Sequence, residues 1–227
     1  MKKMVVIALV LLFTAVSAQA ANISSWDLEG RHTSSVGVSG SADHVTGFSM
    51  VRGPALTVYN NYKGFYSSGW STRTENDYVE FGFSVEDGYE VTLNYLLIGV
   101  GSNNSAPDTA GFYTSLDNFQ DPVATVRQSG ESSKYLSINL SGLGSITGDF
   151  TMHLTAIGNM TVYGNDYSNT VAGPLGIVDT WNSTSGYVDV YFDGEVTELA
   201  PVPLPGAVWL LLSGAAALMG CRKWVRG

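Results

Sequence analysis

Residues 78–100, YVEFGFSVEDGYEVTLNYLLIGV, contain the clearest secondary-structure signal in the chain. Over residues 78–86 apolar and polar side chains alternate, which is typical of a strand with one buried face. The side chains predicted to face the core are those of Val79, Phe81, Phe83 and Val85. Asp87-Gly88 is a turn signal, and residues 90–100 begin a second strand in which Val91, Leu93 and Tyr95 share a face. The two strands are predicted to form a hairpin.

The same alternation recurs in FTMHLTAIG (150–158) and YVDVYFDGEV (187–196), and Gly194 in the latter is predicted to mark a bulge. The inward side chains are expected to be Phe150, Met152, Leu154 and Ala156 in the first segment and Val188, Val190 and Phe192 in the second. Weaker strand candidates cover residues 44–51, 55–60, 110–116, 122–128, 134–140 and 160–164. Because no amphipathic helix is recognisable between these turn-separated strands, residues 21–198 are predicted to form a single all-β domain, a β-sandwich of jelly-roll type.

The N-terminal residues 1–20, MKKMVVIALVLLFTAVSAQA, have the features of a secretory signal peptide. A basic start and a short apolar run precede Ala18 and Ala20, which are in the A-x-A arrangement of a cleavage site. We therefore expect cleavage after Ala20 and export of the body through the inner membrane. The alternative is an N-terminal membrane helix that stays in place.

The C-terminal residues combine prolines, an apolar run and bases. After a linker at 199–203, an apolar segment of about 205–221 is long enough to cross a bilayer as a helix. The basic tail 222–227, with Arg222, Lys223 and Arg226, is expected to remain on the cytoplasmic side. A plain C-terminal anchor, without processing, would explain both the apolar segment and the basic tail. The single cysteine, Cys221, is assigned no role.

Residues 202–227 also resemble the PEP-CTERM sorting signal of Gram-negative bacteria. The residues that carry the resemblance are Val202, Pro203, Leu204, Pro205, Trp209, Ser213, Gly214 and the bases Arg222, Lys223 and Arg226. Leu204 replaces the glutamate of the name-giving motif, a Val-Pro-Leu-Pro variant that leaves the cleavage point less defined. The resemblance implies that the chain is a substrate of exosortase, a membrane protease-transpeptidase, in a cell that makes an exopolysaccharide matrix. Residues 78–85, 112–119, 150–158 and 181–196 of the body also resemble the β-sandwich domains that often precede this signal.

The charge of the body excludes one class of partner. Between Ala21 and Pro205 the chain has six bases and twenty acids, a net charge of −14. Such a surface repels phosphate backbones, so nucleic acid is not a predicted partner. The predicted partners are the inner membrane, an exosortase-type protease and exopolysaccharide.

No catalytic or metal site is predicted. His32, His44 and His153 lack metal-ligand spacing and are interpreted as exposed histidines, since His153 lies on the polar face of its strand. Glu80 with Glu86, and Asp189 with Asp193, are carboxylate pairs of the kind that glycoside hydrolysis uses, but their strand spacing favours solvated acids. Calcium suits the oxygen ligands of Glu86-Asp87, Asp108 and residues 179–182 better than a transition metal does. No complete calcium loop is present, so no cofactor is predicted.

Aromatic residues offer a glycan-binding surface. LTVYNNYKGFYSSGW (56–70) is rich in Gly, Ser and Asn, and Tyr62, Tyr66 and Trp70 are the candidate glycan contacts. The favoured interpretation is that about half of the aromatic residues in this segment pack in the core. The function expected from the whole sequence is that of an exported, non-enzymatic protein of the cell envelope or biofilm matrix, structural or adhesive, associated with exopolysaccharide. A carbohydrate-binding module is the alternative, followed by a polysaccharide-modifying enzyme such as a glycoside hydrolase or lyase.

Overall fold

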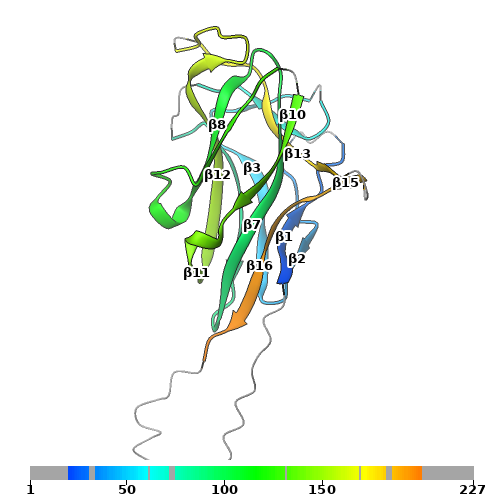
Figure 1. Cartoon of the computed structure of the whole chain (residues 1–227), viewed down its shortest axis with the longest axis vertical. Helices are drawn as coiled ribbons and strands as arrows, with labels where there is room; N and C mark the ends of the chain where they lie inside the picture. Colours follow the sequence, from blue (N-terminus) through cyan, green and yellow to red (C-terminus); the bar gives the residue numbers. More distant parts are fainter. Residues whose placement is uncertain are drawn as a thin grey trace, which may run out of the picture.

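The chain folds into two antiparallel β-sheets packed face to face as a β-sandwich (Figure 1). This computed structural model describes residues 20–30, 34–60, 62–71, 75–130, 132–168, 170–182 and 186–200. In these residues the only helical elements are two short 3₁₀ turns, η1 (Ser115–Asp117) and η2 (Ser141–Leu143). The predicted all-β class is confirmed.

The larger sheet has the strand order β2-β1-β16-β7-β13-β5-β4, and β10 and β11 also pair with β7. Its strands are β1 (Ala20–Trp26), β2 (Gly40–Ser41), β4 (Thr57–Val58), β5 (Phe65–Ser68), β7 (Tyr89–Ser102), β10 (Ser132–Asn139), β11 (Ser145–Ile146), β13 (Leu175–Val178) and β16 (Val190–Glu198). One edge of β7 pairs with β16 and then with β13. The other edge of β7 pairs with β11 and then with β10. The longest strand is therefore the centre of this sheet.

The smaller sheet has the order β3-β6-β12-β8-β9. Its strands are β3 (Val45–Arg52), β6 (Val79–Val85), β8 (Pro107–Thr114), β9 (Ala124–Arg127) and β12 (Asp149–Thr161). A separate two-stranded ribbon joins β14 (Thr180–Asn182) to β15 (Gly186–Val188). Residues 160–164 do not form the separate strand expected of them, because β12 continues to Thr161 and ends in a turn.

The predicted hairpin within residues 78–100 is wrong, because β6 and β7 belong to opposite sheets. β6 pairs with β3 and β12, whereas β7 pairs with β16. The turn itself forms, with the Tyr89 amide donating to the Glu86 carbonyl and Gly88 at φ +91°. Alternation shows which face of a strand is buried, but two strands facing one core from opposite sheets have the same pattern as a hairpin.

The predicted inward faces are confirmed for most strands. The side chains of β6 (Val79, Phe81, Phe83, Val85) and β12 (Phe150, Met152, Leu154, Ala156) are buried. In β7 the alternation shifts after Leu93, because Gly194 and Asp193 of β16 pair with Leu93 and Tyr95, which leaves Asn94 as an extra residue in β7. The register irregularity expected at Gly194 is therefore present, but the bulged residue is in β7 and not in β16. This bulge turns Tyr95 outward, where its hydroxyl lies 3.3 Å from that of Tyr191. Val188 is only half-buried.

An aromatic cluster joins the two sheets. The ring of Phe192 on β16 lies 5.6–5.8 Å from the rings of Trp26, Phe81, Phe83 and Phe150. All five side chains are 0% exposed. Edge-to-face and stacked contacts of this kind add to the free energy of burying large apolar surfaces.

Phe192→Ala should lower the free energy of unfolding by about 3–5 kcal/mol, because it removes the ring shared by both sheets and leaves a cavity. Urea unfolding followed by tryptophan fluorescence measures the change. Tyr135→Ala, at a side chain that is 48% exposed, is the control and should change stability by less than about 1 kcal/mol. If the free energy of unfolding fell equally in Phe192→Ala and Tyr135→Ala, the core would not be centred on Phe192.

Candidate functional site

The ring of Tyr66 lies flat on the outer face of the larger sheet, over positions where the strands have no side chains. Leu96, Ile98 and Val100 of β7 point into the core, so Gly99 and Gly101 face outward. A Cβ atom at Gly176 of β13 would lie 2.6 Å from Cγ of Tyr66, and one at Gly101 would overlap the Tyr66 hydroxyl. These glycines therefore leave the space that the ring fills.

Tyr66 is held both through its backbone and through its side chain. Its backbone carbonyl accepts a 2.8 Å hydrogen bond from Arg52, whose guanidinium carbon lies 3.6 Å from the centre of the Phe65 ring. Burial raises the pKa of Tyr66, and a hydrogen bond with the side chain of Ser133 partly opposes this rise. The ring is thus a fixed, neutral surface at physiological pH.

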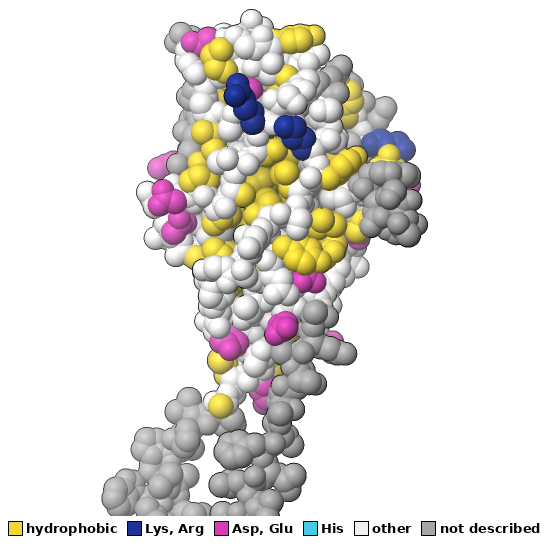
Figure 2. Space-filling view, viewed as in Figure 1, with side chains coloured by type: hydrophobic (Ala, Val, Ile, Leu, Met, Phe, Trp, Pro, Cys, Tyr) yellow, Lys and Arg dark blue, Asp and Glu magenta, His cyan; other side chains and the backbone are white. Residues whose placement is uncertain are grey.

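A tyrosine groove of about 130 Å³ opens beside this ring. We use this name for the hollow whose walls include Lys63, Tyr66, Ser133, Tyr135, Asp179 and Tyr187. Tyr135 is 48% and Tyr187 62% exposed, and Tyr59 and Tyr62 continue the row of rings at centroid distances of 5.6 and 5.2 Å. Figure 2 shows hydrophobic side chains gathered across the middle of one face of the molecule, with few basic groups.

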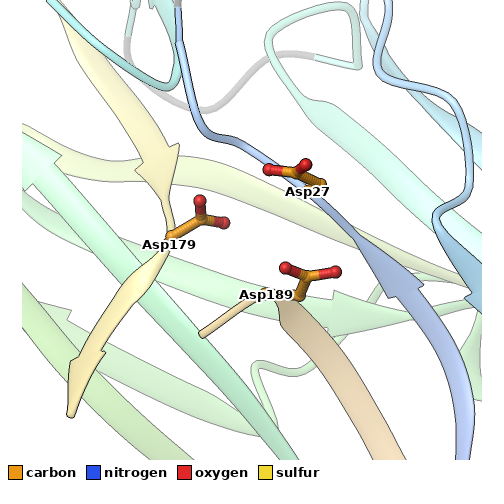
Figure 3. A group of neighbouring side chains, drawn as sticks. All are labelled: Asp27, Asp179 and Asp189. Carbon is orange, nitrogen blue, oxygen red and sulfur yellow. The ribbon is translucent and has the colours of Figure 1, made fainter. Parts of the chain in front are cut away.

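Three carboxylates converge next to the groove. Asp27 follows β1, Asp179 follows β13 and Asp189 precedes β16, and one oxygen of each lies within 4.8 Å of the others (Figure 3). Each group also accepts a hydrogen bond: Asp27 from the Glu29 amide, Asp179 from the Leu28 amide and Asp189 from Ser39. Carboxylate oxygens are ligands of hard cations such as calcium. The cluster supplies such oxygens, but grouped acids alone do not establish a metal site.

Asp179 is the buried member of the cluster, with 6% of its surface exposed. Its pKa is raised to about 6, chiefly by burial and to a lesser extent by the neighbouring Asp189, Asp27 and Glu29, while the hydrogen bond from Leu28 acts in the opposite direction. A carboxyl group with a raised pKa favours the folded state when it is protonated.

The structure brings together some of the predicted site residues and separates others. Tyr66, which is 6% exposed, lines the groove and Tyr62 lies beside it, and their role as glycan contacts stays a prediction. The expectation for Trp70 is wrong, because the ring is fully buried and its indole nitrogen donates to the Ser67 carbonyl. Tyr135, Tyr187 and the grouping of Asp27 with Asp189 were missed, since they come from segments far apart in the sequence.

The carboxylates considered for glycoside hydrolysis are engaged separately. Glu80 bonds His153, and Glu86 bonds His44. Asp193 accepts a hydrogen bond from Asn94, whereas Asp189 belongs to the acidic cluster. In extended chain the two pairs are about 20 and 13 Å apart, beyond the separation used by glycosidases.

The predicted calcium positions and histidines have local partners. Among the calcium positions, Glu86 bonds His44 and Asp108 lies 3.4 Å from Arg127, while Asp179 belongs to the acidic cluster. His44 is exposed as predicted and stacks on Tyr89 at 3.7 Å. His153 is on the outer face of its strand as expected, but its side chain is only 15% exposed, so its interpretation as an exposed histidine is wrong. His32 lies outside the described residues.

The residues of the predicted targeting signals also lie outside the described residues. These are Ala18 and the C-terminal set Val202, Pro203, Leu204, Pro205, Trp209, Ser213, Gly214, Arg222, Lys223 and Arg226. Within the part of the chain that is described, no helix is long and apolar enough to span a membrane.

Comparison of the chain with protein-family models, with curated proteins and with solved structures finds no match. The tyrosine groove and the acidic cluster are therefore assigned from their own residues.

Asp179→Asn should make the protein more stable at pH 7 by on the order of 2 kcal/mol. The stability of the wild type should fall as the pH rises from about 4 through about 6, since the folded state holds the Asp179 proton more tightly than the unfolded state does. Asparagine keeps an acceptor for the Leu28 amide. Thermal unfolding between pH 3.5 and 8 tests this, with the exposed Asp43→Asn as control. If stability fell equally with rising pH in wild type and in Asp179→Asn, the fall would not be due to ionisation of Asp179.

Proposed function

We propose that the protein is an exported, non-enzymatic protein of the cell envelope or extracellular matrix that adheres to exopolysaccharide through the tyrosine groove. The carrying observation is the set of rings on the outer face of the larger sheet, with Tyr66 fixed on glycines and Tyr135 and Tyr187 exposed beside it. Flat rings next to hydroxyl, ammonium and carboxylate groups suit a pyranose, which presents an apolar face and a rim of hydroxyls.

The polymer in the groove is a neutral glycan. Asp179 lines the groove and adjoins Asp27 and Asp189, whereas Lys63 is its basic wall residue among those described. The body as a whole has a net charge of −14 between Ala21 and Pro205. Uronic acid polymers and nucleic acids would meet like charge over most of the surface.

The fold is of jelly-roll type. The strands β6, β7, β8, β10, β12 and β13 alternate between the two sheets along the chain, while β9 and β11 stay in the sheet of the strand before each. The N-terminal strand β1 also pairs with the C-terminal strand β16. Alternation of this kind is how a jelly roll winds its strands around one core.

The positions of the first and last strands support an envelope location. Ala21 pairs with Gly194 near the start of β1, and Glu198 pairs with Tyr89, so β1 begins and β16 ends at the same end of the sandwich (Figure 1). Tyr66 sits at Gly101, about 40 Å further along β7. A body anchored through either terminus would therefore hold the groove away from the membrane.

Delivery and sorting follow the two terminal signals. Residues 1–20 direct export and are removed after Ala20, and residues 205–221 hold the protein transiently in the inner membrane. The Val-Pro-Leu-Pro sequence at 202–205 is then the recognition site of an exosortase-type protease. The resemblance of residues 202–227 to the PEP-CTERM signal supports this route.

The protein recovered from the matrix should end near Val202–Pro205, as measured by intact mass and C-terminal peptide mapping. Pro203→Ala/Pro205→Ala should keep its tail and stay with the inner membrane, because the extended entry to the processing site is lost. Pro201→Ala, outside the motif, is the control and should be processed. Recovery of wild type with Trp224–Gly227 attached would contradict sorting.

Native gels containing hydroxyethylcellulose, xyloglucan, galactomannan or dextran should retard the wild type in at least one of these neutral polymers, and alginate gels should not. Tyr135→Ala and Tyr187→Ala should each weaken retardation about tenfold, as expected for loss of one stacking ring. Tyr163→Ala is the control, because that side chain is 70% exposed and does not line the groove. Absence of retardation in all four neutral polymers would refute the proposal.

A further inference from the structure

A second hollow, of about 540 Å³, lies over the outer face of the smaller sheet. We call it the histidine pocket; its walls include Glu75, Tyr78, Tyr113, Phe119, Gln120 and His153. It is larger than the tyrosine groove, and its volume is in the range of small-molecule binding sites.

A row of side chains crosses three strands at the histidine pocket. Tyr113 of β8 and His153 on β12 line the pocket, and Glu80 of β6 is the cross-strand partner of His153 on its other side. Neighbouring residues along these strands, among them Phe81, Phe112 and Leu154, are fully buried in the core, so the row faces outward. His153 Nε2 lies 2.8 Å from Oε2 of Glu80, which fixes the imidazole in its plane.

Three parallel rings, with His153 in the centre, line one side of the pocket. The imidazole of His153 lies 4.0 Å from the ring of Tyr78 and 3.8 Å from that of Phe119, with interplanar angles of 2° and 7°. On its far side Tyr78 packs on Gly53, where an added Cβ would lie 3.0 Å from the ring. Burial lowers the pKa of His153, although Glu80 acts in the opposite direction. The central ring is therefore held neutral near pH 7.

The segment that carries Phe119 is held in an unfavourable backbone conformation. Asn118 and Phe119 have φ values of 56° and 58°, and for a bulky residue the left-handed region costs on the order of 1–2 kcal/mol. Backbone hydrogen bonds from Asn118 to Ser115 and from Phe119 to Thr114 hold the turn. The Asp121 amide also donates to the side chain of Asp117. Strain that the surroundings enforce is concentrated at ligand sites, where it pre-organises the contact groups.

The chemistry of the histidine pocket matches that of the tyrosine groove. It combines aromatic rings with amide and hydroxyl groups from Gln120, Asn118 and Thr155, and it has a carboxylate at Glu75. With Glu75 in its wall and Glu80 bonded to His153, the pocket disfavours anionic sugars and suits the hydroxyls of a neutral sugar.

We propose that the histidine pocket is a second binding site for neutral glycan, so that one molecule binds two polysaccharide chains and cross-links them. This inference rests on the proposed function of the tyrosine groove. Gly101 and Tyr135 face outward from the larger sheet, and His153 and Tyr113 face outward from the smaller sheet. The two sites therefore lie on opposite faces, separated by the core between sheets about 10 Å apart.

The test is a bridging assay with the four neutral polymers named above. Each polymer is coupled to beads, the protein is added, and capture of the same polymer carrying fluorescein is measured. Wild-type protein should capture labelled polymer on every kind of bead to which the protein itself binds. Phe119→Ala should remain bound to the beads through the groove but lose at least nine-tenths of the capture. Tyr135→Ala/Tyr187→Ala should bind through the pocket alone and lose capture likewise.

Two further variants distinguish the loss of a contact in the pocket from misfolding of the turn that carries Phe119. Glu75→Gln changes an exposed residue of the pocket wall and should lower capture several-fold in a folded protein. Leu116→Ala, in the same 3₁₀ turn but outside the pocket and 47% exposed, should leave capture unchanged.

The outcomes distinguish the two proposals. Retention of wild type on beads without capture would overturn cross-linking while leaving the groove as a glycan site. Full capture by both Phe119→Ala and Glu75→Gln would overturn the pocket as the second site and would indicate bridging by two grooves in a dimer. Failure of wild type to bind any of the beads would refute the groove itself.

Discussion

The structure depends on the burial of Phe192 between the sheets. This ring, supplied by β16 of the larger sheet, contacts Phe81 and Phe83 of β6 and Phe150 of β12 across the core. Because the body lacks cysteine, no disulfide shares this task. Concentrating the large apolar side chains between the layers leaves both outer faces available for polar and partly exposed aromatic residues, and both proposed glycan sites use these faces.

The same alternation along β7 builds the core and the tyrosine groove. Ile98 and Val100 point inward, whereas the residues between and after them, Gly99 and Gly101, present bare backbone to the outside. Tyr66 fills that space, and Tyr135 extends outward from β10 opposite Gly99. A ring positioned by sheet backbone loses little conformational freedom on binding, so the groove is already shaped for a flat ligand.

The molecule is organised along its long axis as well as across its two faces. β1 begins and β16 ends at one end, and the groove is toward the other. The acidic cluster of Asp27, Asp179 and Asp189 lies beside the groove, and the raised pKa of Asp179 shows that burial of its charge is costly there. A protein held at its terminal end and binding glycan at two faces would behave as a cross-link in a polymer network.

The all-β class and the inward faces of β6 and β12 could be predicted from the sequence, because period-two alternation is a local property. The register irregularity beside Gly194 was also expected, but its extra residue, Asn94, belongs to the partner strand β7. The sequence also pointed to Tyr62 and Tyr66. It did not determine the partner of β6, since strands in opposite sheets share the pattern of a hairpin. Only the tertiary structure placed Tyr135 and Tyr187 beside Tyr66, buried Trp70, enclosed His153 between Tyr78 and Phe119, and joined Asp27 to Asp179. Those arrangements bring together segments that are distant in the chain. Contacts of this kind produce no local sequence pattern, so they could not be predicted from the sequence.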